Sequence, residues 1–308
     1  MRRLHTLFAA VALALGIAAA PARAADPAPV PLLWKVSDAD NSVYLLGSFH
    51  LLRPTDYPLS GEVYAALADA EQVLFEVAPE AMASPEAAQA MLMAALRRDG
   101  TALDSELPPA LAARLREWLA ENRDALAKAS IPEGMLQAME PWFVGLLVAQ
   151  MQLSELGMQP ELGLDRHLAD RAREAGKPSG GLETVDDAIA ALDGLSPALQ
   201  RQMLEEALES AQANEAEQLH AGWRRGEVAV LEKALAEMRA EYPELYRRVN
   251  LDRNTAWLGQ LEARLREAGD DDTLAVVGAL HLAGSDGLVE RLRAKGYRVE
   301  RICAACKR

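Results

Sequence analysis

Short apolar runs bounded by glycine, proline or polar turns alternate along the chain with longer segments of helical periodicity. The runs that predict β-strands cover residues 31–36, 42–46, 72–77, 273–277 and 297–302, with a shorter one just before Glu183. The first two are separated by the turn-rich sequence Ser-Asp-Ala-Asp-Asn, which predicts a β-hairpin. Because strands alternate with helices, we expect an α/β (α+β) fold whose central mixed, mostly parallel sheet is extensively covered by helices.

The middle of the chain, from about residue 81 to 250, carries the strongest helical signals. Ser84 and Ser196 are each followed by proline, which predicts a hydroxyl N-cap before a proline at the first helical position. Thr184 and Asp187 have the spacing of a capping box, with aspartate in the reciprocal position. We therefore expect a helical insertion in the middle of the chain.

The first 24 residues differ in composition from the rest of the chain. Two arginines precede an apolar run over residues 7–20, and a small-x-small sequence ends at Ala24. This pattern predicts a signal peptide that is cleaved near Ala24 and Ala25. The apolar run is shorter than the ~20 residues that span a bilayer. We expect residues 25–308 to form one exported domain, periplasmic or secreted, with no stable membrane insertion.

Charge and missing motifs exclude several classes of function. Removing residues 1–24 takes away three arginines and no acidic residue, so the formal charge changes from −14 to −17. Nucleic acid and anionic lipid are therefore poor partners. The sequence contains no H-E-x-x-H, no G-x-S-x-G, no P-loop and no G-x-G-x-x-G after a strand. These absences disfavour standard zincins, α/β-hydrolases, P-loop enzymes and nucleotide-binding Rossmann domains.

The chain has two cysteines, Cys303 and Cys306, close to its C-terminus. In an exported protein they predict a tight local disulfide or a pair without a role. A redox centre is disfavoured because such C-x-x-C motifs open a helix after an early strand. A zinc site would need two further ligands, which the sequence does not indicate.

Two similar sequences lie near opposite ends of the chain. Leu-Leu-Gly-Ser-Phe-His-Leu-Leu at 45–52 and Val-Val-Gly-Ala-Leu-His-Leu-Ala at 276–283 both end an apolar run with Gly-x-x-His-Leu. A lone histidine in an apolar segment is usually a core residue with satisfied hydrogen bonds. However, the carboxyl ends of parallel strands face one crevice, and glycine allows the backbone to turn sharply there. The duplication therefore predicts that His50 and His281 face the same cleft.

Four further polar residues are candidates for the same cleft. Glu76 lies in an apolar strand, so its carboxylate must be paired, hydrogen-bonded or metal-bound. Glu183 precedes a helix and can either reach the cleft or favour the positive helix N-terminus. Asn254 lies on the apolar stripe of a helix that begins near Arg253. Arg253 and Asn254 each have two possible roles: they either orient a ligand or make a structural hydrogen bond.

The other histidines of the helical regions predict less chemistry. His167 follows Asp165 by two residues on a helix, so their side chains point in different directions. Asp165 itself is either a helix cap or a partner that orients a ligand histidine. His220 lies in a polar helical segment, which predicts a position at the surface.

In order and spacing, these landmarks resemble the TraB/GumN family, which includes the TIKI metalloproteases. The family is distantly similar to the erythromycin-esterase and ChaN-like fold group. The matching sequences cover nearly the whole of residues 25–308 and are YLLGSFHLL, VLFEV, EPWF, GLDRHL, GKPSGGLET, LYRRVNLDRNTAWL and AVVGALHLAGSDGLVERLRAKGYRVE.

The resemblance implies a metal-dependent peptidase or hydrolase. The implied metal ligands belong to the two Gly-x-x-His motifs and the buried strand, and they are His50, His281 and Glu76. Arg253 and Asn254 match an Arg-Asn element of the family, and Glu183 matches its Leu-Glu-Thr sequence. Mn²⁺, Co²⁺, Zn²⁺ and Fe²⁺ all accept nitrogen and oxygen ligands, so the sequence does not choose among them.

We therefore expect an exported metal-dependent hydrolase that acts on a peptide or protein. In this scheme a divalent ion activates water, Glu183 serves as the base and Arg253 stabilises the oxyanion. The alternative is a non-catalytic binding protein that uses the same cleft for haem, iron or a peptide. A third hypothesis is a family member that has lost catalysis and is kept for protein contacts.

Overall fold

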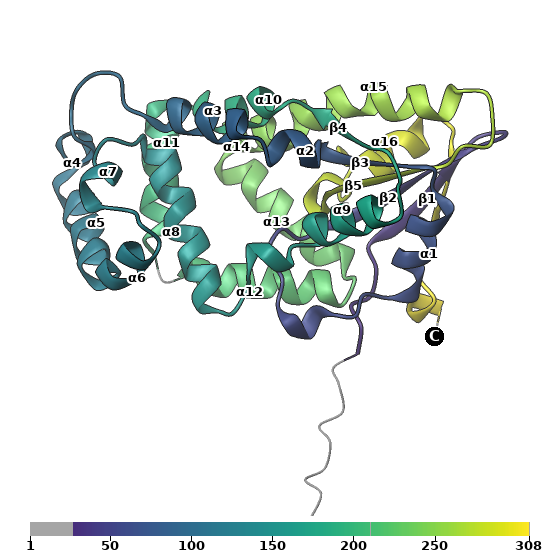
Figure 1. The fold of residues 1–308 in the computed structure, drawn as a ribbon, viewed down its shortest axis with the longest axis horizontal. Coiled ribbons are helices and arrows are strands. Elements are labelled where there is room, and N and C mark those ends of the chain that lie inside the picture. The colour runs from purple at the N-terminus through teal and green to yellow at the C-terminus, as the bar shows by residue number, and fades with distance from the viewer. Residues whose placement is uncertain (1–26, 210, 308) are drawn as a thin grey trace, which may run out of the picture.

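The strands form one mixed sheet in this computed structural model, which describes residues 27–209 and 211–307. Within that part of the chain the sheet has six strands in the order β4-β3-β5-β2-β1-β6 (Figure 1). Their bounds are β1 (Leu33–Ser37), β2 (Ser42–Ser48), β3 (Gln72–Val77), β4 (Ser179–Glu183), β5 (Thr273–Gly278) and β6 (Arg298–Arg301). The four strands from β4 to β2 are parallel, whereas β1 is antiparallel to both neighbours. The predicted α/β class and mostly parallel sheet are confirmed; the predicted signal peptide lies outside the described residues.

Burial explains why the central strands are continuous apolar runs. Every residue of β2 is buried, as are the first five of β5, because helices cover the central part of the sheet. The predicted hairpin of β1 and β2 is confirmed. Its turn is closed by the Asp38 carboxylate, which accepts hydrogen bonds from the N–H groups of Asp40 and Asn41. Edge strand β6 instead alternates exposed and half-buried residues.

The helices outside the arm defined below lie around the sheet, and most of them contribute residues to its hydrophobic core. They are α1 (Gly61–Asp69), α9 (Leu164–Glu174), α10 (Val185–Asp193), α11 (Pro197–Ala207), α12 (Ala211–Arg224), α13 (Val228–Glu241), α14 (Pro243–Tyr246), α15 (Asp252–Arg266) and α16 (Leu288–Ala294). Shorter helical turns are η1 (Pro54–Asp56), η2 (Pro160–Leu162), the π-helix η3 (Arg247–Leu251), η4 (Ala279–His281) and η5 (Ala305–Lys307). None of the helices in the described ranges is long and apolar enough to cross a membrane.

Residues 79–158, here named the helical arm, leave the sheet after β3 and extend to one side of it (Figure 1). The arm contains α2 (Pro79–Met82), α3 (Pro85–Ala95), α4 (Leu103–Glu106), α5 (Pro109–Glu121), α6 (Arg123–Lys128), α7 (Glu133–Leu136) and α8 (Pro141–Glu155). Together with α11, which packs along α8, it has a hydrophobic core separate from that of the sheet. The expectation of one domain stays a prediction, to which the structure adds this second core.

Two of the three predicted helix caps are confirmed. The Ser84 hydroxyl accepts a hydrogen bond of 3.0 Å from a helix N–H, and Thr184 and Asp187 form the reciprocal capping box. Ser196 does stand at the N-cap position before Pro197, as predicted, but its hydroxyl does not cap the helix. Its hydroxyl donates instead to Glu244 at 2.9 Å and so links α11 to α14. The predicted disulfide is also present, with an S–S distance of 2.07 Å between Cys303 and Cys306.

Candidate functional site

The sheet topology brings the two Gly-x-x-His turns and Glu76 to one edge. Strand β5 lies between β2 and β3, and all three are parallel, so their carboxyl ends adjoin. His50 follows β2, Glu76 lies near the end of β3, and His281 ends the turn η4 that follows β5. The two imidazoles, which the sequence predicted to share one cleft, therefore follow strands whose carboxyl ends are neighbours.

The three side chains converge on the space above Gly278. A Cβ atom built on this glycine would lie 3.1 Å from Glu76 Oε1 and 3.6 Å from both His50 Nε2 and His281 Cδ2. The Gly278 N–H also donates a hydrogen bond of 2.6 Å to Glu76 Oε1. Because Gly278 has no side chain, two imidazoles and a carboxylate can approach it closely, and the place where they meet is here named the Gly278 space.

Each imidazole is oriented through its Nδ1 atom. His50 Nδ1 lies 2.8 Å from Asp165 Oδ2, and His281 Nδ1 lies 2.8 Å from Asn254 Oδ1. When Nδ1 carries the proton of a neutral ring, Nε2 is left with a free lone pair. Of the alternatives considered for Asp165, orientation of His50 is confirmed.

Asn254 is fully buried and has a structural role in the site. Its Nδ2 group donates to the carbonyl of Asp286 at 3.0 Å and to Asn250 Oδ1 at 3.2 Å. Asn250 in turn donates to the Leu280 carbonyl, beside His281. The π-helix η3 ends just before Asn254, and such turns are frequent at functional sites. Sequence reasoning missed Asn250, although its spacing of four residues from Asn254 places both amides on one helix face.

Arg253 connects both glutamates and one histidine. Its Nη2 atom lies 2.5 Å from Glu76 Oε2 and 2.6 Å from Glu183 Oε1, and Nε also donates to Glu183. Nη1 lies 3.2 Å from His281 Nε2. The guanidinium stacks on Trp257, whose indole N–H donates to Glu183 at 3.1 Å. One cation therefore offsets two carboxylates that are almost removed from water.

Burial and charge set the protonation states of the site. Burial alone raises the pKa of Glu76, but attraction to His281, Arg253 and His50 outweighs it and lowers this pKa to about 2. Burial lowers the pKa of His281 to about 4. The Asp165 charge raises the pKa of His50 to about 9. At neutral pH the site thus combines an anionic Glu76, a neutral His281 and a protonated His50, which must lose its proton before it can bind a metal.

The donor atoms are of the kinds that a divalent cation binds, but they are not arranged to hold one. Two imidazole nitrogens and a carboxylate surround one space, and both rings are held through Nδ1 by a side-chain oxygen, as ligand histidines usually are. However, Arg253 contacts Glu76 and His281 Nε2 in the same region. In the described part of the chain, no three His, Cys, Asp or Glu side chains are arranged to hold a metal ion. Metal binding would therefore require Arg253 to withdraw from these two residues.

The prediction that His220 lies at the surface is wrong. It is buried, and its Nε2 atom lies 2.8 Å from Asp56 Oδ2. Asp56 also accepts a hydrogen bond of 2.5 Å from Arg224, and the neighbouring Trp223 donates to the Gly47 carbonyl at 2.9 Å. We name His220, Asp56 and Arg224 the Asp56 cluster. It anchors α12 to the loop that follows β2 and His50.

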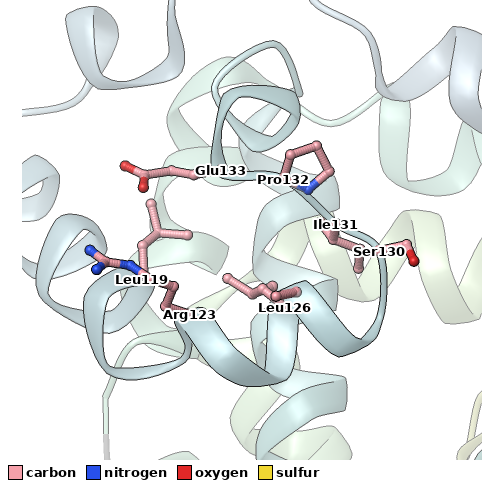
Figure 2. A pocket seen from close by; sticks show the side chains of 8 residues that line it. Leu119, Arg123, Leu126, Ser130, Ile131, Pro132 and Glu133 are labelled. Atoms are coloured by element: carbon pink, nitrogen blue, oxygen red, sulfur yellow. The ribbon is translucent and has the colours of Figure 1, made fainter.

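Two other features lie outside the site. His167 is 3.2 Å from the Tyr64 hydroxyl and is not among the groups nearest to Gly278. The arm contains a hollow of about 320 Å³, and Leu126 and Ile131 are among its apolar lining residues (Figure 2). None of the predicted site residues lines this hollow.

Close packing around the His50 turn predicts the effect of a small substitution. A Cβ atom at Gly163 would lie 2.1 Å from the His50 carbonyl oxygen, so Gly163→Ala must displace the backbone. We expect the free energy of unfolding to fall by about 1–3 kcal/mol in urea titrations. Gly259→Ala is the matched control, since nothing lies within 4 Å and alanine favours a helix interior by about 0.5–1 kcal/mol. Equal stability of the two variants would contradict the packing argument.

The fold and the site define an α/β protein with a polar site at the carboxyl ends of its parallel strands. Residues 32–301 match the model of the TraB/PrgY/gumN family, and the chain belongs to this family. The resemblance seen in the sequence is thereby confirmed. Comparisons with curated proteins and with solved structures found no match.

Proposed function

We propose that this protein is a metal-dependent hydrolase that cleaves peptide bonds. The observation that carries the proposal is the convergence of His50, Glu76 and His281 on the Gly278 space. These three residues would hold the ion, and Mn²⁺, Co²⁺, Zn²⁺ or Fe²⁺ suits their nitrogen and oxygen donors. When bound, a divalent ion supplies Lewis acidity, which polarises a carbonyl group and lowers the pKa of water.

The remaining residues act through position and charge. Arg253 points its Nη1 group toward the site, where it can donate to the oxygen that becomes negative during hydrolysis. Glu183 is bound by Arg253 and Trp257, so we assign it the positioning of Arg253 in place of the base role expected from sequence. Asn254 acts through His281, whose Nδ1 atom it holds.

We propose that the protein acts outside the cytoplasm. The sequence pattern of the first 24 residues and the Cys303–Cys306 disulfide support this location, since disulfides persist in oxidising compartments.

Metal analysis combined with a peptide-cleavage assay tests the proposed activity. We expect purified protein loaded with each candidate metal to retain about one ion per chain and to cleave members of a peptide library. The His50→Ala, His281→Ala double variant should lose both properties. His167→Ala, which removes a histidine outside the site, should keep both. A metal-free wild type that no added metal activates would refute the proposal.

A non-catalytic binding protein is the second candidate. The Arg253 contacts favour it, because the guanidinium already neutralises Glu76 and contacts His281 without a metal. In that case the wild type remains folded and shows no cleavage with any metal. A Soret band that develops on addition of haem and is lost in the histidine double variant would support this function.

A further inference from the structure

Exposed apolar side chains are concentrated in the helical arm. Among the described residues, the large hydrophobic side chains that are exposed all belong to residues 79–158, and they are Met82, Leu92, Met93, Leu146 and Leu156. Their exposed fractions range from 37% at Leu156 to 52% at Met82. Single exposed apolar residues are normal, but here all of them belong to one segment, which makes this segment the candidate for binding a partner.

Helix α8 presents apolar residues on two faces. One face packs on α11, while the exposed positions Leu146, Gln150 and Ser154 and the half-buried Leu153 carry no charge. Their spacing of four, three and one residues places them on a single stripe. A helix that faces only water usually carries charged residues there. The first charged residue of α8 is Glu155, at its last position.

This surface adjoins the candidate site at both ends of the arm. Met82 lies on α2, which begins two residues after the strand that carries Glu76 and packs against β3 and β4. At the other end, the Leu156 carbonyl accepts a hydrogen bond of 3.1 Å from Arg53, three residues after His50. A chain bound along the arm would therefore pass close to the Gly278 space.

The charges on these helices are all negative. Helices α2, α3 and α8, and α10 packed against α3, contain no lysine or arginine, and their acidic residues are Glu80, Glu86, Glu155, Asp186, Asp187 and Asp193. The complementary partner is positively charged. An anionic peptide would meet repulsion from these groups and from the net charge of −14.

We infer that the arm surface binds a polypeptide segment that combines large apolar side chains with lysine or arginine. The flexible side chains of Met82 and Met93 suit a surface that accepts more than one sequence. The bound segment would be the substrate of the proposed hydrolase. Its cleavage rests on the proposed function, whereas its binding does not.

Fluorescence anisotropy with three labelled peptides of equal length tests the inference. One peptide is apolar and basic, one apolar and acidic, and one polar and basic. We expect the first to bind at least about tenfold more tightly than the other two. Leu146→Gln with Met93→Gln should weaken its binding about tenfold, as should Glu80→Lys with Glu86→Lys. Glu117→Lys with Glu232→Lys reverses exposed charges on α5 and α13, two helices without exposed large apolar side chains, and should change binding less than about twofold.

Binding needs no turnover, so it is measured also in the His50→Ala, His281→Ala variant, where the same affinity is expected. A protein without metal or cleavage activity that still discriminates the peptides would refute the proposed function and support the binding surface. Equal affinities for all three peptides, or no binding of any, would overturn the inference. It would also be overturned if the Leu146→Gln, Met93→Gln substitutions abolished binding to phosphatidylcholine–phosphatidylglycerol vesicles or self-association while leaving peptide binding unchanged.

Discussion

Glu76→Gln is expected to reduce peptide hydrolysis by about 100- to 10,000-fold, the range found when a charged catalytic group is removed. The substitution keeps the shape of the side chain and removes the negative charge between His50, His281 and Arg253. Divalent metal binding should weaken as well, because a neutral amide oxygen attracts a cation less strongly than a carboxylate does. Initial cleavage rates and metal content of the purified variant measure both effects.

Glu262→Gln is the matched control for this substitution. Glu262 is a buried glutamate of α15 that pairs with Arg266 and Lys295, each at 2.8 Å, and takes no part in the site. The Glu262→Gln variant should retain wild-type turnover. Activity in Glu76→Gln within about twofold of the control would show that the Glu76 charge has no catalytic role.

Asp56→Asn is expected to lower the free energy of unfolding by about 3–5 kcal/mol at neutral pH, since it removes one partner of a buried charged network. Asp56 is fully buried between His220 and Arg224. Glu237→Gln, in the exposed pair with Lys233, should change stability by less than about 1 kcal/mol. Guanidinium titrations of both variants measure the difference.

Acid should reduce the difference between wild type and Asp56→Asn. Burial raises the pKa of Asp56, but the hydrogen bonds from His220, Arg53 and Arg224 outweigh it and hold the pKa below its ordinary value of 3.8. Because the folded-state pKa is the lower one, the stabilisation is complete above about pH 4 and is lost as the pH falls through the folded-state value. A difference that stays constant down to pH 2 would contradict this role of Asp56.

The positions of the strands, and of the two histidine turns at their ends, follow from local sequence. Apolar runs marked the strands because β2 and β5 are buried on both faces. The paired Gly-x-x-His turns located His50 and His281 because a parallel sheet aligns its strand ends. Parallel strands of one sheet place their carboxyl ends at the same edge in any order, so the local sequences were enough to predict that the two turns share this edge.

The contacts of Arg253 and His220 depend on packing between distant segments. The sequence made Arg253 a candidate for the same cleft, but nothing near it indicates that it pairs with Glu76, which is 177 residues away, or contacts His281. His220 sits in a helix of polar appearance, and only the tertiary structure places Asp56 against it. Periodicity reports which face of a helix is apolar but not which element covers that face.

Strand β5 is the second-to-last strand of the chain, and it fills the gap between β2 and β3. During synthesis the first 272 residues can emerge while the strand that precedes His50 and the strand that carries Glu76 still lack the neighbour that joins them. The third side chain of the site arrives only with residue 281. Partly translated chains therefore have no assembled site, and any hydrolytic activity is confined to molecules that have completed the sheet.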